Sequence, residues 1–235
     1  MKQIMIGKRV FSNPQRFAVC APDGLPIKEY YKEVFEEIFV FYHPFIKPES
    51  IDYELFKPDT YPNRNEIREN CVVVTWKQFL TLSGIENFRK LDVGLRTNIN
   101  GLREEYQDEN IAQMIKNTCR DKKIGEPTEG LFPYFIMDNL LKGIKALGHN
   151  WIWCGNEFAT ERKLTFIDDI ITDNNILDQC KNLFTNDHHL LITTHWDSHF
   201  SLLCSGKSTV EQLVNYCNLE GFYCTDQTEI YWSLS

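Results

Sequence analysis

The sequence has no long apolar run, no Cys-x-x-Cys pair and no dense cluster of Lys and Arg. Its longest run of aliphatic and aromatic residues, 38–42, is far too short to span a bilayer. Residues 1–10 contain no apolar segment followed by a small-residue cleavage site, so they do not resemble a secretory signal. We therefore expect a soluble cytoplasmic protein that does not enter a membrane.

The eight cysteines form no metal-binding motif. They lie far apart along the chain, and several are inside apolar runs, as Cys154 is after Trp153 and Cys204 is after Leu203. Such positions are typical of buried free thiols in a reducing compartment. We therefore expect free cysteines and no cysteine-based zinc site.

Acidic residues outnumber basic ones, 33 to 25, and the formal net charge is −8. An acidic surface works against binding to phosphate backbones, so we expect no nucleic-acid partner. The chain is also rich in aromatic residues, with 16 Phe, 10 Tyr and 5 Trp. Each aromatic side chain buries a large area, which favours a well-packed core.

The first half of the chain is predicted to be mainly helical. The spacing of Tyr31, Phe35 and Ile38 is helical, and Thr75 with Gln78 forms a capping box. The expected elements are a helix at 27–42, a strand at 71–74, and helices at 76–83, 85–106 and 109–122.

The second half is predicted to alternate short strands with helices. Its apolar segments are short, aromatic or β-branched, and bounded by turn residues. The expected strands are 151–154, 163–167, 190–194, 200–204, 221–224 and 229–232, and the expected helices are 132–147, 173–183 and 209–218. Several connections are too short for a crossover helix, which indicates at least partly antiparallel pairing.

The fold class is therefore predicted to be α+β, with a mainly helical N-terminal half packed on a C-terminal mixed, largely antiparallel sheet with helices. The Gly- and Pro-containing segment 124–130 is the best linker in the chain. It divides the chain into a subdomain at 1–125 and a subdomain at 130–235, unless the two form one continuous domain.

The sharpest local signal is the segment from His195 to His199, which lies between two apolar strands. If Trp196, Asp197 and Ser198 form a hairpin turn, the two histidines become cross-strand neighbours about 5 Å apart at Cβ. Two imidazoles and the Asp197 carboxylate could bind a divalent metal. Asp and Ser are also ordinary turn residues, so turn architecture alone explains the same pattern.

A metal site needs further ligands, and four carboxylates lie on or beside neighbouring strands: Glu157, Glu161, Asp168 and Asp169. Glu157 and Glu161 could line the rim of a cleft and belong to the candidate site. An exposed, charged connection in which they pair with Arg162 explains them equally.

The segment 205–209, Ser-Gly-Lys-Ser-Thr, joins a strand to a helix as a phosphate-binding loop does. The loop requires a Gly where this chain has Ser201, inside the predicted strand. We interpret the segment instead as a helix start, with Ser208 as the cap and Glu211 completing a capping box.

Five pieces of the sequence resemble a known family. They are NEFATERKL at 156–164, TTHWDSHF at 193–200, EGFYCT at 220–225, YP at 61–62 and VTWK at 74–77. The family is a bacterial one of unknown function, found mainly in Bacillus-type organisms. The resemblance implies a cytoplasmic bacterial protein, and it transfers no activity and no site residue.

Three functions stay open on the sequence. A non-catalytic binding or interaction protein fits best, because no complete catalytic motif is present; one version is an immunity-type protein that covers a protein partner with an acidic, aromatic face. The second is a metal-dependent hydrolase that uses His195, Asp197 and His199. The third is a small-molecule sensor, which an aromatic-lined cavity with a few polar groups would favour.

Overall fold

A seven-stranded antiparallel sheet is the centre of the structure, a computed structural model that describes residues 5–6, 9–10, 14–57 and 59–234. Its strand order is β11-β3-β10-β9-β8-β6-β7, and every neighbouring pair is antiparallel. The strands are β3 (Glu37–Tyr42), β6 (Trp151–Gly155), β7 (Arg162–Phe166), β8 (Asn182–Phe184), β9 (Leu191–Thr194), β10 (Phe200–Ser205) and β11 (Gly221–Tyr223).

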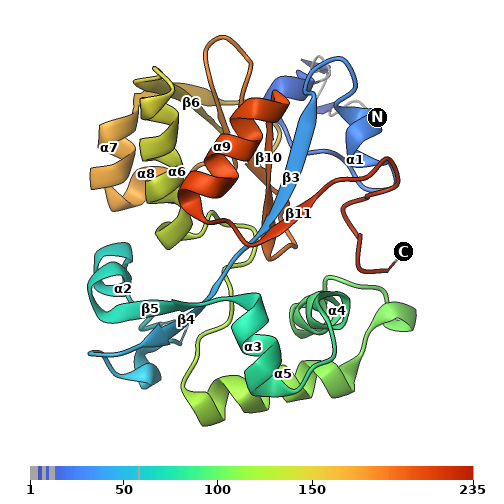
Figure 1. The fold of residues 1–235 in the computed structure, drawn as a ribbon, viewed down its shortest axis with the longest axis vertical. Coiled ribbons are helices and arrows are strands. Elements are labelled where there is room, and N and C mark those ends of the chain that lie inside the picture. Colours follow the sequence, from blue (N-terminus) through green and yellow to red (C-terminus); the bar gives the residue numbers. More distant parts are fainter. Residues whose placement is uncertain (1–4, 7–8, 11–13, 58, 235) are drawn as a thin grey trace.

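Both faces of the sheet are buried, as the alternation along β3 illustrates. Phe39 and Phe41 point to one core, whereas Ile38, Val40 and Tyr42 point to the other. The first core is covered by four helices on one face (Figure 1). They are α6 (Tyr134–Ala146), α7 (Ile167–Thr172), α8 (Asn174–Asp178) and α9 (Lys207–Cys217).

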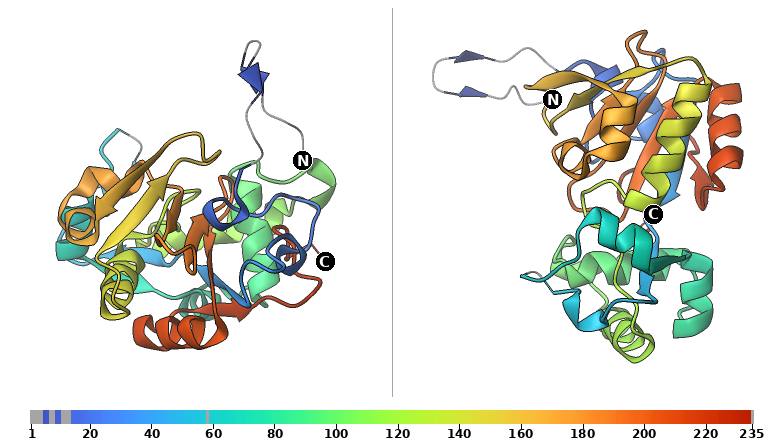
Figure 2. Two further views of the ribbon diagram at one scale, coloured as in Figure 1. Left: turned by 90° about the horizontal axis from the view of Figure 1, so that it is seen from above. Right: turned by 90° about the vertical axis from the view of Figure 1, so that its left-hand side faces the viewer.

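The second core extends from the other face of the sheet into a separate group of elements, the helical lobe (residues 45–124), which lies below the sheet in Figure 1 and in the right-hand view of Figure 2. The chain enters this lobe directly from β3. The lobe contains β4 (Phe45–Pro48), η2 (Tyr53–Leu55), α2 (Arg64–Asn70), β5 (Cys71–Val74), α3 (Trp76–Ser83), α4 (Phe88–Asn98), η3 (Glu104–Tyr106) and α5 (Glu109–Lys122).

The N-terminal segment and the C-terminal tail also cover this second face. Ala18, Ile27, Ile230 and Trp232 are buried in the same cluster as the sheet residues. The remaining elements are the short strands β1 (Met5–Ile6) and β2 (Arg9–Val10), the turn η1 (Arg16–Ala18) and α1 (Ile27–Tyr30).

The α+β class and the largely antiparallel sheet are confirmed. The division at residues 125–130 stays a prediction; β3, from the first half, pairs with β10 and β11, as the alternative of one continuous domain expects. In the described part of the chain, no helix is long and apolar enough to cross a membrane.

The helix predicted at 27–42 is wrong. The segment forms the four-residue helix α1 and then the strand β3, which lies second from one edge of the sheet. The run Ile38–Tyr42 is β-branched and aromatic, and a strand buried on both faces has the continuous apolar pattern that a buried helix also shows.

Three other predicted elements differ from the structure by more than a few residues. Residues 229–232 form turns rather than a strand, and the predicted helix at 173–183 stops at Asp178 so that β8 can follow. Helix α4 ends at Asn98 rather than continuing to residue 106, because Asn100 adopts a positive φ of 56°.

The predicted helix caps are confirmed in part. Thr75 and Gln78 form the capping box, and Gly84 ends α3 in the left-handed conformation with φ 72°. The cap assigned to Ser208 is wrong, because α9 begins one residue after Gly206 and Ser208 lies inside its first turn.

The expectation of eight free thiols is also wrong for one pair. Cys154 on β6 and Cys180 form a disulfide with a Cα–Cα distance of 5.3 Å, and the other six cysteines are free. The two residues are 26 apart in sequence, and the pairing of β6 with β8 brings them together.

Thiol counting checks this pairing. When cells are lysed directly into denaturant with an alkylating reagent, we expect six modified cysteines per chain, and eight after prior reduction. The reagent adds a fixed mass per thiol, so intact-mass spectrometry gives the count. Eight modified cysteines without reduction would contradict the disulfide and would agree with a reducing compartment.

Candidate functional site

The turn between β9 and β10 does not have the geometry predicted from the sequence. Thr194 pairs with Ser201, so the next residue outward, His195, lies opposite Phe200 and not opposite His199. A shift of one residue moves a side chain to the other face of a sheet. The two histidines are therefore not cross-strand neighbours, and each has its own set of partners.

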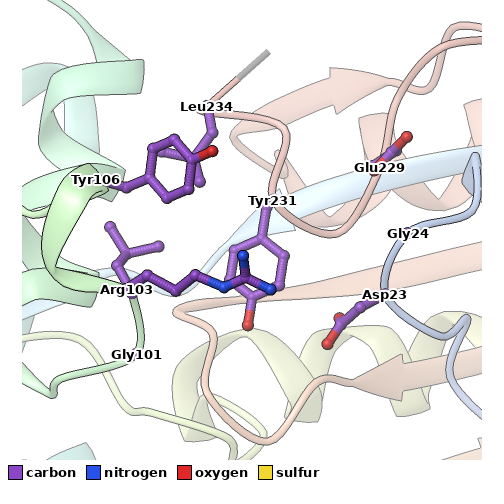
Figure 3. Close-up of a pocket in the computed structure, with 9 residues that line it drawn as sticks. Asp23, Gly24, Gly101, Arg103, Tyr106, Glu229, Tyr231 and Leu234 are labelled. Carbon is purple, nitrogen blue, oxygen red and sulfur yellow. The ribbon is translucent and has the colours of Figure 1, made fainter.

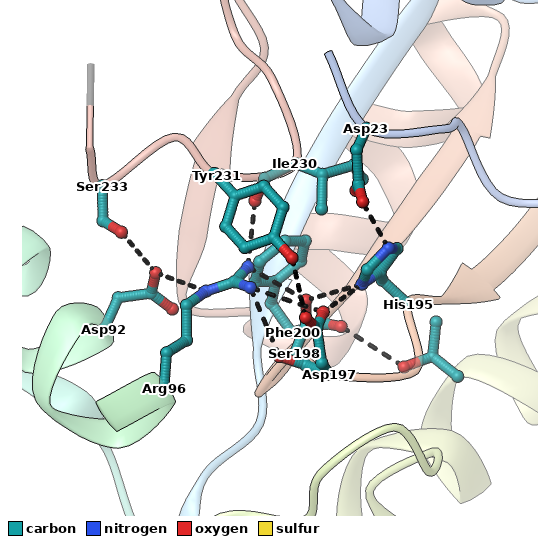
Figure 4. Close-up of polar contacts among 11 residues, drawn as sticks. Asp23, Asp92, Arg96, His195, Asp197, Ser198, Phe200, Ile230, Tyr231 and Ser233 are labelled. Atoms are coloured by element: carbon teal, nitrogen blue, oxygen red, sulfur yellow. Dashed lines mark hydrogen bonds and ion pairs between the residues drawn. The ribbon is translucent and has the colours of Figure 1, made fainter. Parts of the chain in front are cut away.

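His195 lies between two carboxylates (Figure 4). Its Nδ1 is 2.5 Å from Oδ1 of Asp197, and its Nε2 is 3.1 Å from Oδ1 of Asp23. Asp197 also accepts a hydrogen bond from the Tyr231 hydroxyl, at 2.8 Å. The imidazole is almost fully buried, whereas the Asp23 side chain is 48% exposed and forms the outer end of this chain of contacts.

These contacts favour the charged forms of His195 and Asp197. Burial by itself lowers the pKa of His195, but its hydrogen bonds to Asp197 and Asp23 outweigh this effect and raise it above 6.5. Burial likewise raises the pKa of Asp197, and the hydrogen bond from His195 reverses the shift, so that the pKa falls below 3.8. The two shifts favour the imidazolium form of His195 and the carboxylate form of Asp197.

Arg96 of α4 joins this pair to the helical lobe. Its side chain is fully buried; Nε donates to Asp92 at 3.0 Å, and Nη2 donates to the Ser198 hydroxyl at 3.0 Å and to the Ile230 carbonyl at 2.9 Å. Nη1 is 3.5 Å from Oδ1 of Asp197. The resulting buried cluster, called here the Arg96 network, comprises Asp23, Asp92, Arg96, His195, Asp197, Ser198, Tyr231 and Ser233.

His199 belongs to a second buried group. Its Nδ1 lies 3.4 Å from the Thr128 carbonyl, and its Nε2 has no hydrogen-bond partner among the described residues. The same carbonyl is 2.8 Å from Nδ1 of His43, whose Nε2 contacts the Ser201 hydroxyl at 2.8 Å. Burial lowers the pKa of both histidines, to about 3 for His43, so both are neutral.

The linker that returns from the helical lobe is fixed against the turn. The backbone N–H of Gly130 donates to the Ser198 carbonyl at 3.0 Å, and Lys181 donates to the Gly130 carbonyl. Gly130 has φ 56°, and a Cβ there would lie 2.3 Å from the Trp196 carbonyl oxygen. Only glycine fits this close approach, so the linker holds the turn in one conformation.

The other predicted site residues lie apart from His195. Trp196 is 56% exposed at the tip of the turn. Glu161 lines a different cavity, beside Arg162, and Glu157 lies in the β6–β7 connection, where its charge acts on Lys181. Asp168 forms an ion pair with Lys145 of α6 at 2.5 Å.

The structure does not bring His195, Asp197 and His199 together around one point where a metal ion could bind. Among the described residues, no group of three or more His, Cys, Asp or Glu side chains is placed to hold a metal ion. His195 and Asp197 form an ion pair with each other, whereas His199 contacts the Thr128 carbonyl. A bound divalent metal stays a prediction of the sequence.

A cavity of about 580 Å³ opens beside the Arg96 network, at the junction of the two lobes (Figure 3). Asp23 and Tyr231 belong to both the network and the cavity wall. Three separate segments supply the wall, from the N-terminal region, the α4–α5 connection and the C-terminal tail. The lining residues are Asp23, Gly24, Gly101, Leu102, Arg103, Tyr106, Glu229, Tyr231 and Leu234.

Sequence reasoning identified His195 and Asp197 but missed Asp23, Arg96 and Tyr231. A signal for Arg96 was present, because Asp92 and Arg96 are four residues apart, next to the apolar positions Leu91 and Leu95 of the same helix. No local pattern marks Asp23, whose partner is far away in the sequence.

The fold and the site define an α+β protein with a cavity beside a buried ion-pair network. The chain belongs to the family described as protein of unknown function (DUF2711), whose profile matches residues 23–234. It is 24% identical over 216 residues to the uncharacterized protein YwbB of Bacillus subtilis (strain 168), covering 89% of this chain and 96% of that protein. No solved structure matches the chain. The predicted resemblance to a Bacillus-type family of unknown function is thereby confirmed.

Proposed function

We propose that this chain is a non-catalytic small-molecule sensor whose ligand binds in the cavity beside the Arg96 network. The observation that carries the proposal is the cavity itself. Its volume of about 580 Å³ lies in the range of small-molecule sites, and its wall combines aromatic and aliphatic side chains with a few charged ones.

The rigidity of the wall supports binding. Asp23 is held by His195, and Tyr231 is held by Asp197, whose position Arg96 fixes in turn. A site that is ordered before the ligand arrives loses less conformational entropy on binding. The buried network therefore has a natural role as the support of one side of the cavity.

The contacts that both ring nitrogens of His195 make with carboxylates favour a binding role over a catalytic one. Both ring nitrogens face carboxylates, so neither is free to exchange a proton with a substrate in this arrangement. Ser198 is 3.3 Å from the same Nδ1 that faces Asp197, and its oxygen accepts from Arg96. This geometry does not activate the serine as a nucleophile.

Substitution of one cavity residue tests the proposal. Tyr106 is 47% exposed and lines the cavity, whereas Tyr216 on α9 is 60% exposed and does not line it. We expect at least one compound in a chemically diverse metabolite library to raise the Tm of the wild type and of Tyr216→Ala by about 5 to 10 °C at a concentration of 100 Kd. Tyr106→Ala should show a much smaller shift.

Two outcomes would contradict the proposal. One is a library in which no compound stabilises the wild type, and the other is stabilisation that is equal in Tyr106→Ala and Tyr216→Ala. The immunity-type protein partner stays a separate prediction, for which affinity capture is the test.

A further inference from the structure

Two opposite charges at the cavity wall have no partner among the residues that the structure describes. Arg103 and Glu229 both line the cavity, and neither side chain forms a hydrogen bond or an ion pair with another residue in the described ranges. The third charged residue of the wall, Asp23, belongs to the Arg96 network and is paired with His195. The cavity thus offers one free cation and one free anion among its described residues.

The acidic and basic residues of the cavity come from different sides of it. Figure 3 shows Asp23 and Glu229 on one side, whereas Arg103 extends from the side of Tyr106 and Leu234. The Arg96 network adjoins the same side of the cavity. It contains the carboxylates of Asp23, Asp92 and Asp197, and these outnumber its two basic groups, the Arg96 guanidinium and the His195 imidazole. The surplus negative charge adds to that of Glu229, so a ligand cation is favoured on this side.

The same cavity wall also contains apolar surface. Tyr106, Tyr231, Leu102 and Leu234 supply it. The pKa of Tyr231 is raised, by burial and by its hydrogen bond to Asp197, so its ring stays neutral. A tyrosine ring face attracts an ammonium group and also packs against an aliphatic or aromatic ligand body.

We infer that the ligand is a small amino-carboxylic acid zwitterion with an apolar body, with its ammonium group at Glu229 and Asp23 and its carboxylate at Arg103. A guanidinium binds a carboxylate through two parallel hydrogen bonds, and a carboxylate accepts hydrogen bonds from an ammonium. This inference rests on the proposed sensor function and names its ligand class.

Calorimetric titration of the full chain tests the ligand class. The probes are leucine, phenylalanine, tyrosine, tryptophan and 5-aminopentanoate, each beside the amine that lacks its carboxylate and the acid that lacks its amino group. We expect at least one zwitterion to bind more than tenfold tighter than both of its matched analogues, because each analogue leaves one charged group of the cavity unpaired.

Single-charge variants assign the two ends. Arg103→Gln should weaken binding of the zwitterion by about 10- to 100-fold and leave the matched amine unchanged. Glu229→Gln should weaken the zwitterion and the amine and leave the matched acid unchanged. Neither variant removes a side-chain hydrogen bond or ion pair among the described residues, and the exposed residues Glu211 and Lys163, replaced by Gln, serve as controls.

The results separate this inference from the sensor function. If no zwitterion binds, or if both variants keep wild-type affinity, the ligand class is wrong. If neutral or singly charged compounds still give a Tyr106-dependent rise in Tm, the cavity binds a ligand of another class and the sensor function stands. If no compound of any class binds, both are overturned.

Discussion

Replacing Arg96 by Met is expected to lower the free energy of unfolding by about 3 to 5 kcal/mol, because it leaves buried carboxylates without their cation. The guanidinium contacts the Asp92 and Asp197 carboxylates and donates to the Ile230 carbonyl. It also lies over the Tyr231 ring, 4.6 Å from the ring centre. Met replaces the apolar stem of the arginine, so the loss is mainly electrostatic rather than a loss of packing.

Urea unfolding of the wild type and of Arg96→Met, followed by fluorescence, measures this difference. The control is Arg120→Met, which removes an exposed ion pair with Asp121 and should cost about 0 to 1 kcal/mol. A cost for Arg96→Met that is no larger than for Arg120→Met would show that the network does not join the two lobes as the structure indicates. Loss of ligand binding should accompany the loss of stability, because Asp197 positions Tyr231 at the cavity wall.

The sequence predicts best those features that depend on neighbouring residues. The capping box at Thr75 and the ends of α3 follow from side chains within one turn of each other. The hairpins of the second half follow from short apolar segments separated by polar turns. Helix α9 differs from its prediction by only a few residues, because its apolar face repeats at helical spacing.

The failures occur where distant parts of the chain decide the local structure. Residues 37–42 become a strand because β10 and β11 flank them on both sides, and nothing within the segment reports those partners. The same applies to Cys154 and Cys180, which meet through the pairing of β6 with β8.

The turn between β9 and β10 contains one feature that the sequence predicts and one that it does not. Its position was predicted, because His195 and Asp197 stand out between two apolar strands. Its register was not, and a one-residue shift separates His195 from His199. The residues that connect His195 to the cavity wall, Asp23 and Tyr231, lie near opposite ends of the chain.

The buried histidines give the protein an acid-sensitive stability. The pKa of His43 is lowered from 6.5 to about 3, first by burial, and that of His199 is also lowered by burial. Between about pH 6.5 and pH 3, the unfolded chain therefore binds protons at His43 that the folded chain does not bind. The free energy of unfolding must fall as the pH falls through this window.

His195 acts in the opposite direction. Its folded pKa is raised, so its contribution to stability is fully present below pH 6.5 and is lost as the pH rises through the folded pKa. Below pH 6.5 the contribution of His195 is therefore constant, and the slope there comes from His43 and His199, which favour unfolding in acid. The depressed pKa of Asp197 matters only at lower pH, because its contribution is present above about 3.8.

His43→Gln is expected to flatten this slope by about 1.4 kcal/mol per pH unit, or on the order of 3 kcal/mol between pH 6.5 and pH 4.5. Urea unfolding at pH 4.5, 5.5, 6.5 and 7.5 measures the slope, which does not depend on any constant cost of the substitution. The exposed His189, replaced by Gln, is the matched control and should leave the slope unchanged. His195→Gln should leave the slope below pH 6.5 unchanged and should reduce the loss of stability between pH 6.5 and pH 7.5, because the contribution of His195 changes only above pH 6.5. Equal slopes for the wild type and His43→Gln would mean that the His43 imidazole accepts a proton in the folded protein, and that the buried group formed with Thr128 and Ser201 is open to water.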